Sequence, residues 1–256
     1  MPRLDRRALA KALALGAASV LAGCDQLSRS PKVLATLKGA EGVTRRAQRL
    51  LLPRKALAAE FAEADISKDF YANGSTNPDD AAYQSLAAGG FADWRLEVGG
   101  LVARPLRLSL AELKARPSRT QITRHDCVEG WSGIAKWTGV PLGVILEEAG
   151  LKPAARFVVF YCADSLEATL DGSGQYYESI DLIDAYHPQT ILAYGMNGGP
   201  LPVANGAPLR LRVERQLGYK QAKYVMRIEA VDSFAGIAGG NGGYWEDRGY
   251  EWYAGI

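Results

Sequence analysis

The sequence contains little cysteine and little histidine. Its 256 residues include three cysteines, Cys24, Cys127 and Cys162, and two histidines, His125 and His187. Because it has no Cys-x-x-Cys pair and no Cys-x-x-Cys-His motif, the chain cannot attach its own c-type haem or hold a four-cysteine iron–sulfur cluster. A closed zinc site would require nearly all of these side chains to converge. Any redox chemistry must therefore use another cofactor and a separate electron partner.

The sequence also lacks an excess of charge of either sign. Lys and Arg number 30 and Asp and Glu number 28, which leaves a net charge of only +2. This balance gives no electrostatic support to a general nucleic-acid-binding role. With 48% hydrophobic and 23% charged residues, the composition is that of an ordinary globular protein. The length suffices for one sizeable core, or for one domain with a small appendage.

The first 23 residues have the pattern of an export signal. Basic residues precede the run ALAKALALGAASVLAG (residues 8–23), which is too short and too rich in alanine for a membrane span and is typical of a signal peptide. The pair Arg6-Arg7 resembles the twin-arginine export signal, although Asp5 stands where Ser or Thr usually precedes the arginines. Twin-arginine export carries folded proteins, often with a cofactor already inserted.

Cys24 directly follows this apolar run. The tetrapeptide Leu-Ala-Gly-Cys (residues 21–24) resembles the bacterial lipoprotein processing box, in which the cysteine is lipidated. The alternative is a plain signal peptide with a coincidental cysteine. We expect an exported, periplasmic protein that is held at a membrane by a lipid anchor on Cys24.

The remainder of the chain divides at about residue 66. Residues 24–65 mix basic and scattered apolar residues and predict a tether followed by a short amphipathic helix. Residues 66–256 consist of short segments separated by frequent Gly and Pro, which indicates many strands and loops. No repeat of fixed period is present. We therefore predict a single mixed, strand-rich α+β domain.

Several elements of this domain can be placed from local patterns. Ser109, with Glu112 three residues later, forms a capping box that predicts a helix start, and Gly150 predicts the end of a second helix. Alternation and β-branched or aromatic enrichment predict strands. These strands are expected within residues 94–108, 121–127, 155–164, 207–218 and 223–232.

Cys127 lies in the segment RHDCVEGWSG (residues 124–133), at the end of a predicted strand. A packing cysteine is more often found inside an apolar run, as Cys162 is. A nucleophilic cysteine needs a base, and His125 is two residues away on the same face of the strand. A soft anionic sulfur is also a good ligand for a thiophilic metal. From these residues alone, packing, nucleophile and metal ligand all stay open.

The longer pattern resembles the catalytic domain of the sulfite-oxidase family of molybdopterin enzymes, over roughly residues 66–235. The blocks that carry the resemblance are CVEGWS (127–132), WTGVPL (137–142), MNGGPLP (196–202), NGAPLRL (205–211) and LGYK (217–220) with Lys223. The resemblance implies a molybdenum–molybdopterin cofactor with one pterin dithiolene per metal. It also implies that the Cys127 thiolate is the protein ligand to molybdenum and a catalytic residue, with His125 and Asp126 beside it.

Further cofactor contacts follow from the resemblance to the bacterial methionine-sulfoxide-reductase branch of the family. Asn205 and Arg210 match pterin-contacting positions, and the Gln221-Ala222-Lys223 segment matches a loop that binds the phosphate. Two weaker matches also follow from the resemblance. One is at a position where that branch has a threonine that contacts the cofactor, and the other is in an early loop that meets the pterin. They are, in that order, Cys162 and the pair Tyr71-Ala72.

We therefore expect an oxidoreductase that transfers an oxygen atom and two electrons to or from a small sulfur oxyanion, an S-oxide or an N-oxide. Electrons would be exchanged with a membrane haem protein or a soluble cytochrome, and the protein would be a monomer. Arg124, Arg212, Arg215 and Arg248 are candidates to hold an oxyanion. Two alternatives are a cysteine hydrolase that uses Cys127 and His125, and a lipoprotein that binds a ligand without a cofactor.

Overall fold

The computed structural model describes residues 30–169 and 172–256, so the predictions for residues 1–23 and for Cys24 lie outside the described residues. The chain divides into two compact units, residues 1–52 and 53–256. The described part of the first unit is helix α2 (Pro31–Leu51), which begins with proline and has Arg49 in its last turn. At 21 residues it is longer than the short helix expected. Among the described residues, no helix combines the length and apolar character that crossing a membrane requires.

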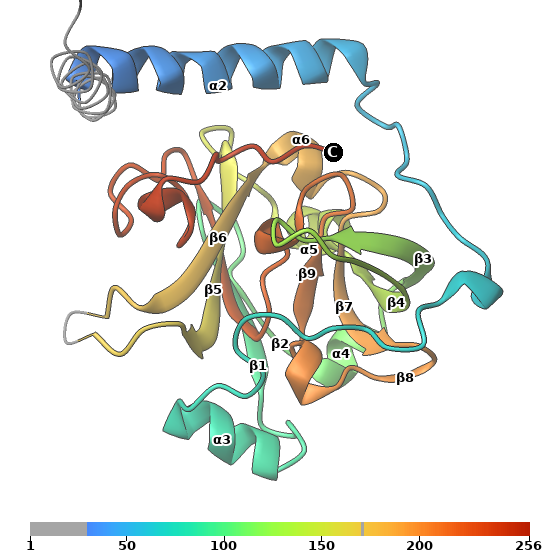
Figure 1. Cartoon of the computed structure of the whole chain (residues 1–256). Helices are drawn as coiled ribbons and strands as arrows, with labels where there is room; N and C mark the ends of the chain where they lie inside the picture. The colour runs from blue at the N-terminus through green and yellow to red at the C-terminus, as the bar shows by residue number, and fades with distance from the viewer. Residues whose placement is uncertain (1–29, 170–171) are drawn as a thin grey trace, which may run out of the picture. The chain divides into compact units, whose positions relative to one another are not determined.

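The second unit contains two five-stranded sheets (Figure 1). The first has the order β2-β1-β10-β5-β6, in which β1 and β10 pair in parallel. Its strands are β1 (Arg95–Gly100), β2 (Leu106–Ser109), β5 (Phe157–Ser165), β6 (Gln175–Asp181) and β10 (Val225–Val231). The second has the order β3-β4-β7-β8, with β9 paired to β7. Its strands are β3 (Arg119–Asp126), β4 (Ser132–Pro141), β7 (Ile191–Met196), β8 (Gly199–Pro200) and β9 (Arg210–Arg212).

Short helices precede, connect and follow these strands. They are η1 (Glu63–Asp65), α3 (Ala81–Ala88), α4 (Leu110–Lys114), α5 (Leu142–Ala149), α6 (Leu182–Ala185), η2 (Val203–Asn205), η3 (Gly218–Lys220) and η4 (Glu246–Arg248). The predicted capping box is present, because Ser109 accepts a hydrogen bond from the Glu112 backbone while the Glu112 carboxylate accepts one from Ser109. Gly150 ends α5 at a positive φ of 69°, as expected for a helix C-cap.

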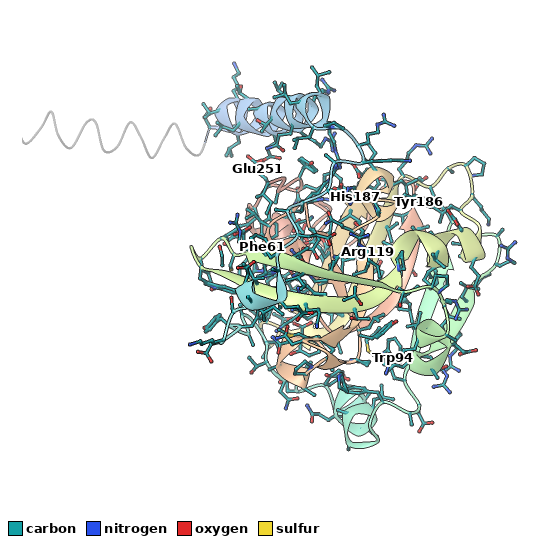
Figure 2. All side chains as sticks on the ribbon, turned by 90° about the vertical axis from the view of Figure 1, so that its right-hand side faces the viewer. Phe61, Trp94, Arg119, Tyr186, His187 and Glu251 are labelled. Carbon is teal, nitrogen blue, oxygen red and sulfur yellow. The ribbon has the colours of Figure 1, made fainter. Side chains whose placement is uncertain are left out.

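The mixed α+β fold predicted from the sequence is confirmed, with two differences in extent. The segment 207–218, expected to be one strand, contributes only the three residues of β9 before it turns away. The second compact unit begins at Pro53 and so includes residues 53–65 as well as residues 66–256. Phe61 donates its backbone N–H to Ile122 of β3 at 2.9 Å, so this entry segment lies along the sheet, as Figure 2 shows at the Phe61 label.

The main core is formed by apolar side chains from both sheets and from α5. It includes Trp94, Leu96, Phe160, Ile228 and Leu211, each fully buried. A smaller cluster around Trp137 covers β4 and β7. Strands β5 and β9 contribute side chains to the main core, and the ends of β3, β5 and β9 carry the polar residues described next.

Candidate active site

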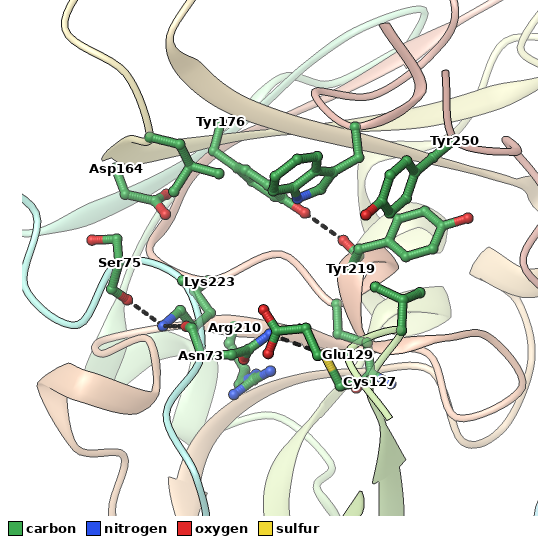
Figure 3. Close-up of a pocket in the computed structure, with 16 residues that line it drawn as sticks. Asn73, Ser75, Cys127, Glu129, Asp164, Tyr176, Arg210, Tyr219, Lys223 and Tyr250 are labelled. Atoms are coloured by element: carbon green, nitrogen blue, oxygen red, sulfur yellow. Dashed lines mark hydrogen bonds between the residues drawn. The ribbon is translucent and has the colours of Figure 1, made fainter. Parts of the chain in front are cut away.

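One pocket of about 710 Å³, part of it open to solvent, lies where these strand ends meet the loops (Figure 3). In Figure 3, Asp164 and Ser75 lie at one end of the pocket, and Tyr219 and Tyr250 lie near the other. The lining residues are Asn73, Gly74, Ser75, Cys127, Val128, Glu129, Asp164, Leu166, Tyr176, Arg210, Gly218, Tyr219, Gln221, Lys223, Trp245 and Tyr250.

Cys127 stands at the start of the turn that follows β3. Its backbone N–H donates to the Trp131 carbonyl at 3.0 Å, and Gly130, at a positive φ of 88°, donates back to the Cys127 carbonyl at 3.1 Å. The side-chain amide of Asn73 donates to Sγ at 3.7 Å. Burial raises the pKa of the Cys127 thiol, and the Glu129 carboxylate adds to the rise. Without a cation or metal beside it, this sulfur is therefore a poor nucleophile at neutral pH.

His125 is not placed as a base for this thiol. Its ring is fully buried, and Nδ1 accepts a hydrogen bond from Nη1 of Arg212 at 3.0 Å. Burial lowers the pKa of His125 well below its usual value, and the charges of Arg212 and Arg210 lower it further. Asp126 points elsewhere and pairs with Arg124 at 2.8 Å. The cysteine–histidine dyad required by the hydrolase alternative is therefore not assembled.

Arg210 and Asn205 form a buried group of donors beside the pocket. Nη1 of Arg210 donates to the Asn205 carbonyl at 3.0 Å, and its guanidinium lies 4.9 Å from the centre of the Trp137 ring. Burial lowers the pKa of Arg210 to about 9, and the Arg212 charge is the second cause. Nε of Arg210 and Nδ2 of Asn205 are buried without a hydrogen-bond partner among the described residues. Unpaired buried donors are costly, so this arrangement suits a ligand that accepts hydrogen bonds.

Lys223 connects the loops on the other side of the pocket. Its Nζ donates to the backbone carbonyls of Asn73 at 2.8 Å, of Ala204 at 3.1 Å and of Ser75. Burial lowers the pKa of Lys223 to about 7, and the neighbouring Arg210 charge contributes. An anion in the pocket would relieve both effects. The next residue, Tyr224, has a positive φ of 53°, a strained conformation that turns the chain sharply after Lys223.

Asp164 adds an acidic group to the pocket wall. Its side chain is almost fully buried, and Oδ1 has no hydrogen-bond partner in the part of the chain that the structure describes. Burial raises the pKa of Asp164 from 3.8 to about 7, while the Lys223 charge opposes the rise. Near neutral pH this carboxyl therefore holds a proton in a substantial fraction of molecules.

The structure brings together four of the predicted site residues in the pocket lining: Cys127, Arg210, Gln221 and Lys223. Five others do not line the pocket: Asn205, Cys162, Ala222, Tyr71 and Ala72. Cys162 is buried in the main core, and Ala222 bonds through its carbonyl to Leu211. Tyr71 packs edge-on against Trp131 and is 62% exposed, with Ala72 beside it in the chain.

Other lining residues were not predicted from the sequence. Asn73, Gly74 and Ser75 line the pocket and directly follow the predicted pair Tyr71-Ala72 in the chain. Asp164 and Tyr176 approach the pocket from β5 and β6 through sheet pairing, which no local sequence pattern announces. The C-terminal residues Trp245 and Tyr250 also line it.

The four arginines considered for oxyanion binding are each paired with a carboxylate. Arg212 meets Glu214 at 2.6 Å with both side chains fully buried, and Arg215 meets Asp184 at 3.0 Å. Arg124 pairs with Asp126 at 2.8 Å, and Arg248 with Glu167 at 3.0 Å. None of these four side chains lines the pocket.

Comparison with known proteins assigns the fold. Residues 85–235 match the sequence model of the oxidoreductase molybdopterin-binding domain. The chain belongs to this molybdopterin oxidoreductase family, the sulfite-oxidase family. A putative protein-methionine-sulfoxide reductase subunit, YedZ1, of Azospira oryzae is 37% identical over 98% of this chain and 87% of its own length. The protein-methionine-sulfoxide reductase catalytic subunit MsrP of Xanthomonas axonopodis is 36% identical over 89% of this chain and 70% of its own.

Among solved structures, the sulfane dehydrogenase SoxCD of Paracoccus pantotrophus is similar over 56% of this chain and 39% of its own, at 26% identity and a TM-score of 0.49. The family match over residues 85–235 and the two relatives above make the protein a molybdopterin-dependent oxidoreductase by family. Its pocket fits that cofactor, because the buried donors Arg210 Nε and Asn205 Nδ2 and the acceptor Gln221 Oε1 have no partner within the described residues. A pterin carries both donors and acceptors, and its phosphate is an anion for the Lys223 side.

Proposed function

We propose that this oxidoreductase reduces neutral S-oxides, and methionine-sulfoxide side chains in particular. The reaction takes two electrons and two protons, releases the oxygen as water and leaves a thioether. A molybdenum–pterin group would supply two-electron oxygen-atom transfer when bound. Its metal would be held by the Cys127 thiolate, and its pterin by Asn205, Arg210, Gln221 and Lys223.

The distribution of charge in the pocket supports a neutral substrate. The four candidate arginines are paired elsewhere, and the two lining cations, Arg210 and Lys223, stand on the side of the proposed pterin contacts. The rest of the lining includes the carboxyl groups of Glu129 and Asp164 and the rings of four aromatic residues. An anionic substrate such as sulfite would meet the like charge of Glu129 there, whereas a neutral S-oxide would not. The printed names of the two relatives above support the same reaction class.

Asp164 is suited to supply one of the two protons. It lines the pocket, and its raised pKa of about 7 keeps a proton available near neutral pH. We expect Asp164→Asn to lower kcat for S-oxide reduction about 100-fold, the scale of a lost general acid, with little change in molybdenum content.

The electrons require a separate carrier, and we propose a haem protein at the membrane. The chain contains no haem-attachment motif and too few cysteines for an iron–sulfur cluster of its own. The relatives' names call them subunits, which supports a partner protein. The twin-arginine-like and lipoprotein-like patterns of residues 1–24 support export and a lipid anchor at the same membrane.

The test combines metal analysis with kinetics on protein made in a host that synthesises molybdopterin. We expect about one molybdenum per chain, and a kcat/KM for methionine sulfoxide at least tenfold above the kcat/KM for sulfite. Cys127→Ser should abolish turnover, because a hard hydroxyl is a poor ligand for a soft site. Cys162→Ala, which removes the other described thiol, should retain most activity. Substoichiometric molybdenum that Cys127→Ser leaves unchanged would refute the metal assignment, and a preference for sulfite would refute the substrate class.

A further inference from the structure

We propose that Trp245 and Tyr250, in the C-terminal aromatic segment (residues 244–250), are specificity-determining residues that receive the apolar part of the substrate. The inference rests on the proposed S-oxide reduction and goes beyond it by assigning the residues that select which S-oxide enters. These residues lie outside the matched family domain, which ends at residue 235.

The two rings form one wall of the pocket that Cys127 also lines. Trp245 and Tyr250 stack with their centroids 5.2 Å apart at an interplanar angle of 28°. Tyr250 also meets Tyr219 edge-on at 5.2 Å, and Figure 3 shows these two tyrosines side by side. Tyr250 is 38% exposed. The wall therefore presents aromatic surface to the pocket and also reaches solvent, as an entrance must.

The aromatic segment is held rigidly against the rest of the domain. Glu246, which lies between the two rings in sequence, forms a buried ion pair with Lys220, and Lys220 also pairs with Glu178 of β6. The backbone N–H of Tyr244 donates to the Tyr177 carbonyl at 3.0 Å. In Figure 1 this red C-terminal segment lies beside β6. These contacts make the segment a fixed wall rather than a loose flap.

A comparison with Trp252, two residues beyond this segment, separates a pocket role from simple packing. Trp252 is also aromatic, but its ring contacts Phe157 at 5.4 Å and Phe234 at 5.6 Å, and its Nε1 donates to Ser179. Trp252 does not line the pocket, whereas Trp245 and Tyr250 do. The side chains of Leu166 and Val128 add apolar surface to the same lining.

Such a wall suits a flexible sulfur-bearing chain. Aromatic rings make favourable contacts with sulfur and bury methyl and methylene groups. A methionine-sulfoxide side chain offers a methyl group and two methylenes beside the S–O group. Dimethyl sulfoxide offers only two methyls and would gain much less from the wall. The segment should therefore select by the length of the apolar chain that carries the S-oxide.

The test compares kcat/KM for N-acetyl-methionine-sulfoxide amide and for dimethyl sulfoxide in the molybdenum-loaded protein. Trp245→Ala should lower kcat/KM for the methionine derivative about tenfold through KM, since lost apolar contacts of this size are worth tenfold or more. The same variant should change kcat/KM for dimethyl sulfoxide less than twofold and leave the molybdenum content unchanged. The matched control is Tyr186→Ala, which removes an exposed tyrosine that does not line the pocket (Figure 2).

If Trp245→Ala fails to fold, Tyr250→Ala at the exposed edge takes its place, with the same expected selectivity. If the wild type reduces S-oxides, two results would overturn this assignment alone. One is an equal loss of kcat/KM for both substrates in the variant, and the other is an unchanged kcat/KM for both. A loaded wild type that reduces neither S-oxide would overturn the proposed function and this assignment with it.

Discussion

Lys220, in the short helix η3 beside the pocket, forms a fully buried ion pair with Glu246 of the C-terminal segment. Glu178 approaches the same ammonium from β6, so two carboxyl groups share one buried lysine. Burial raises the pKa of Glu178 well above its usual value, and the neighbouring Glu246 is the second cause. This cluster fastens the C-terminal segment to the loop that carries Gln221 and Lys223.

Replacing Lys220 by methionine should destabilise the protein strongly. Removing one partner of a buried ion pair leaves uncompensated charge and costs about 3–5 kcal/mol. We expect that loss in the free energy of unfolding, measured by urea denaturation. The control is Lys152→Met at an exposed position, for which a change within about 0.5 kcal/mol is expected. Equal stability of the two variants would contradict a structural role for the cluster.

Asn205→Ala should separate cofactor binding from folding. Because Nδ2 of Asn205 is buried without a hydrogen-bond partner in the part of the chain that the structure describes, its removal should leave the cofactor-free protein as stable as the wild type or slightly more stable. Cofactor affinity should fall up to about tenfold, the value of one hydrogen bond, measured as pterin and molybdenum retained per protein.

Asn197→Ala is the matched control for this experiment. Its side-chain oxygen accepts from the Lys136 backbone at 2.9 Å, and its positive φ of 50° favours asparagine. We therefore expect the opposite pattern, with lower stability and unchanged cofactor retention. An Asn205→Ala variant that is destabilised and retains its cofactor would show a structural role instead.

Asp164 should make the stability of the cofactor-free protein depend on pH. Its pKa is raised in the folded state to about 7, so the folded state holds the proton more tightly than the unfolded chain does. The associated stabilisation is complete below pH about 4, the unfolded pKa, and is lost as the pH rises through about 7. Asp164→Asn should therefore gain stability relative to the wild type between pH 5 and pH 8. Denaturation curves at these two pH values measure this, and a constant difference would refute it.

Gly218→Ala should disturb the pocket through His125. A Cβ at this position would lie 2.5 Å from His125 Nε2 and 3.2 Å from the Asp126 carbonyl oxygen. The ring cannot move freely because Arg212 holds it, so we expect a loss of about 1–3 kcal/mol, as for overpacking. Gly236→Ala, whose Cβ would meet nothing within 4 Å, should leave the melting temperature unchanged. Two equally stable alanine variants would contradict the tight packing of Gly218 against His125.

Local sequence patterns were sufficient to predict two helix ends, several strands and the family of this protein. The capping box at Ser109 and the glycine at 150 placed two helix ends correctly, because hydrogen bonds within a few residues fix such ends. Alternating and β-branched segments likewise located β3, β5 and β10. The ordered blocks around Cys127 and residues 205–223 identified the family, which the match over residues 85–235 confirms.

Only the tertiary structure decided how the pocket is walled and charged. Asp164 and Tyr176 line it because their strands, β5 and β6, pair with each other. Trp245 lines it although it lies more than 100 residues beyond Cys127 in the chain. In the folded chain His125 accepts a hydrogen bond from Arg212 instead of facing Cys127, and each of the four candidate arginines pairs with a carboxylate. Sequence spacing gives the geometry of neighbours along a strand or helix, but charge pairing and burial depend on contacts between distant segments. The residue types in the sequence indicated the kind of chemistry, and the packing of the strand ends determined which of those residues meet in the pocket.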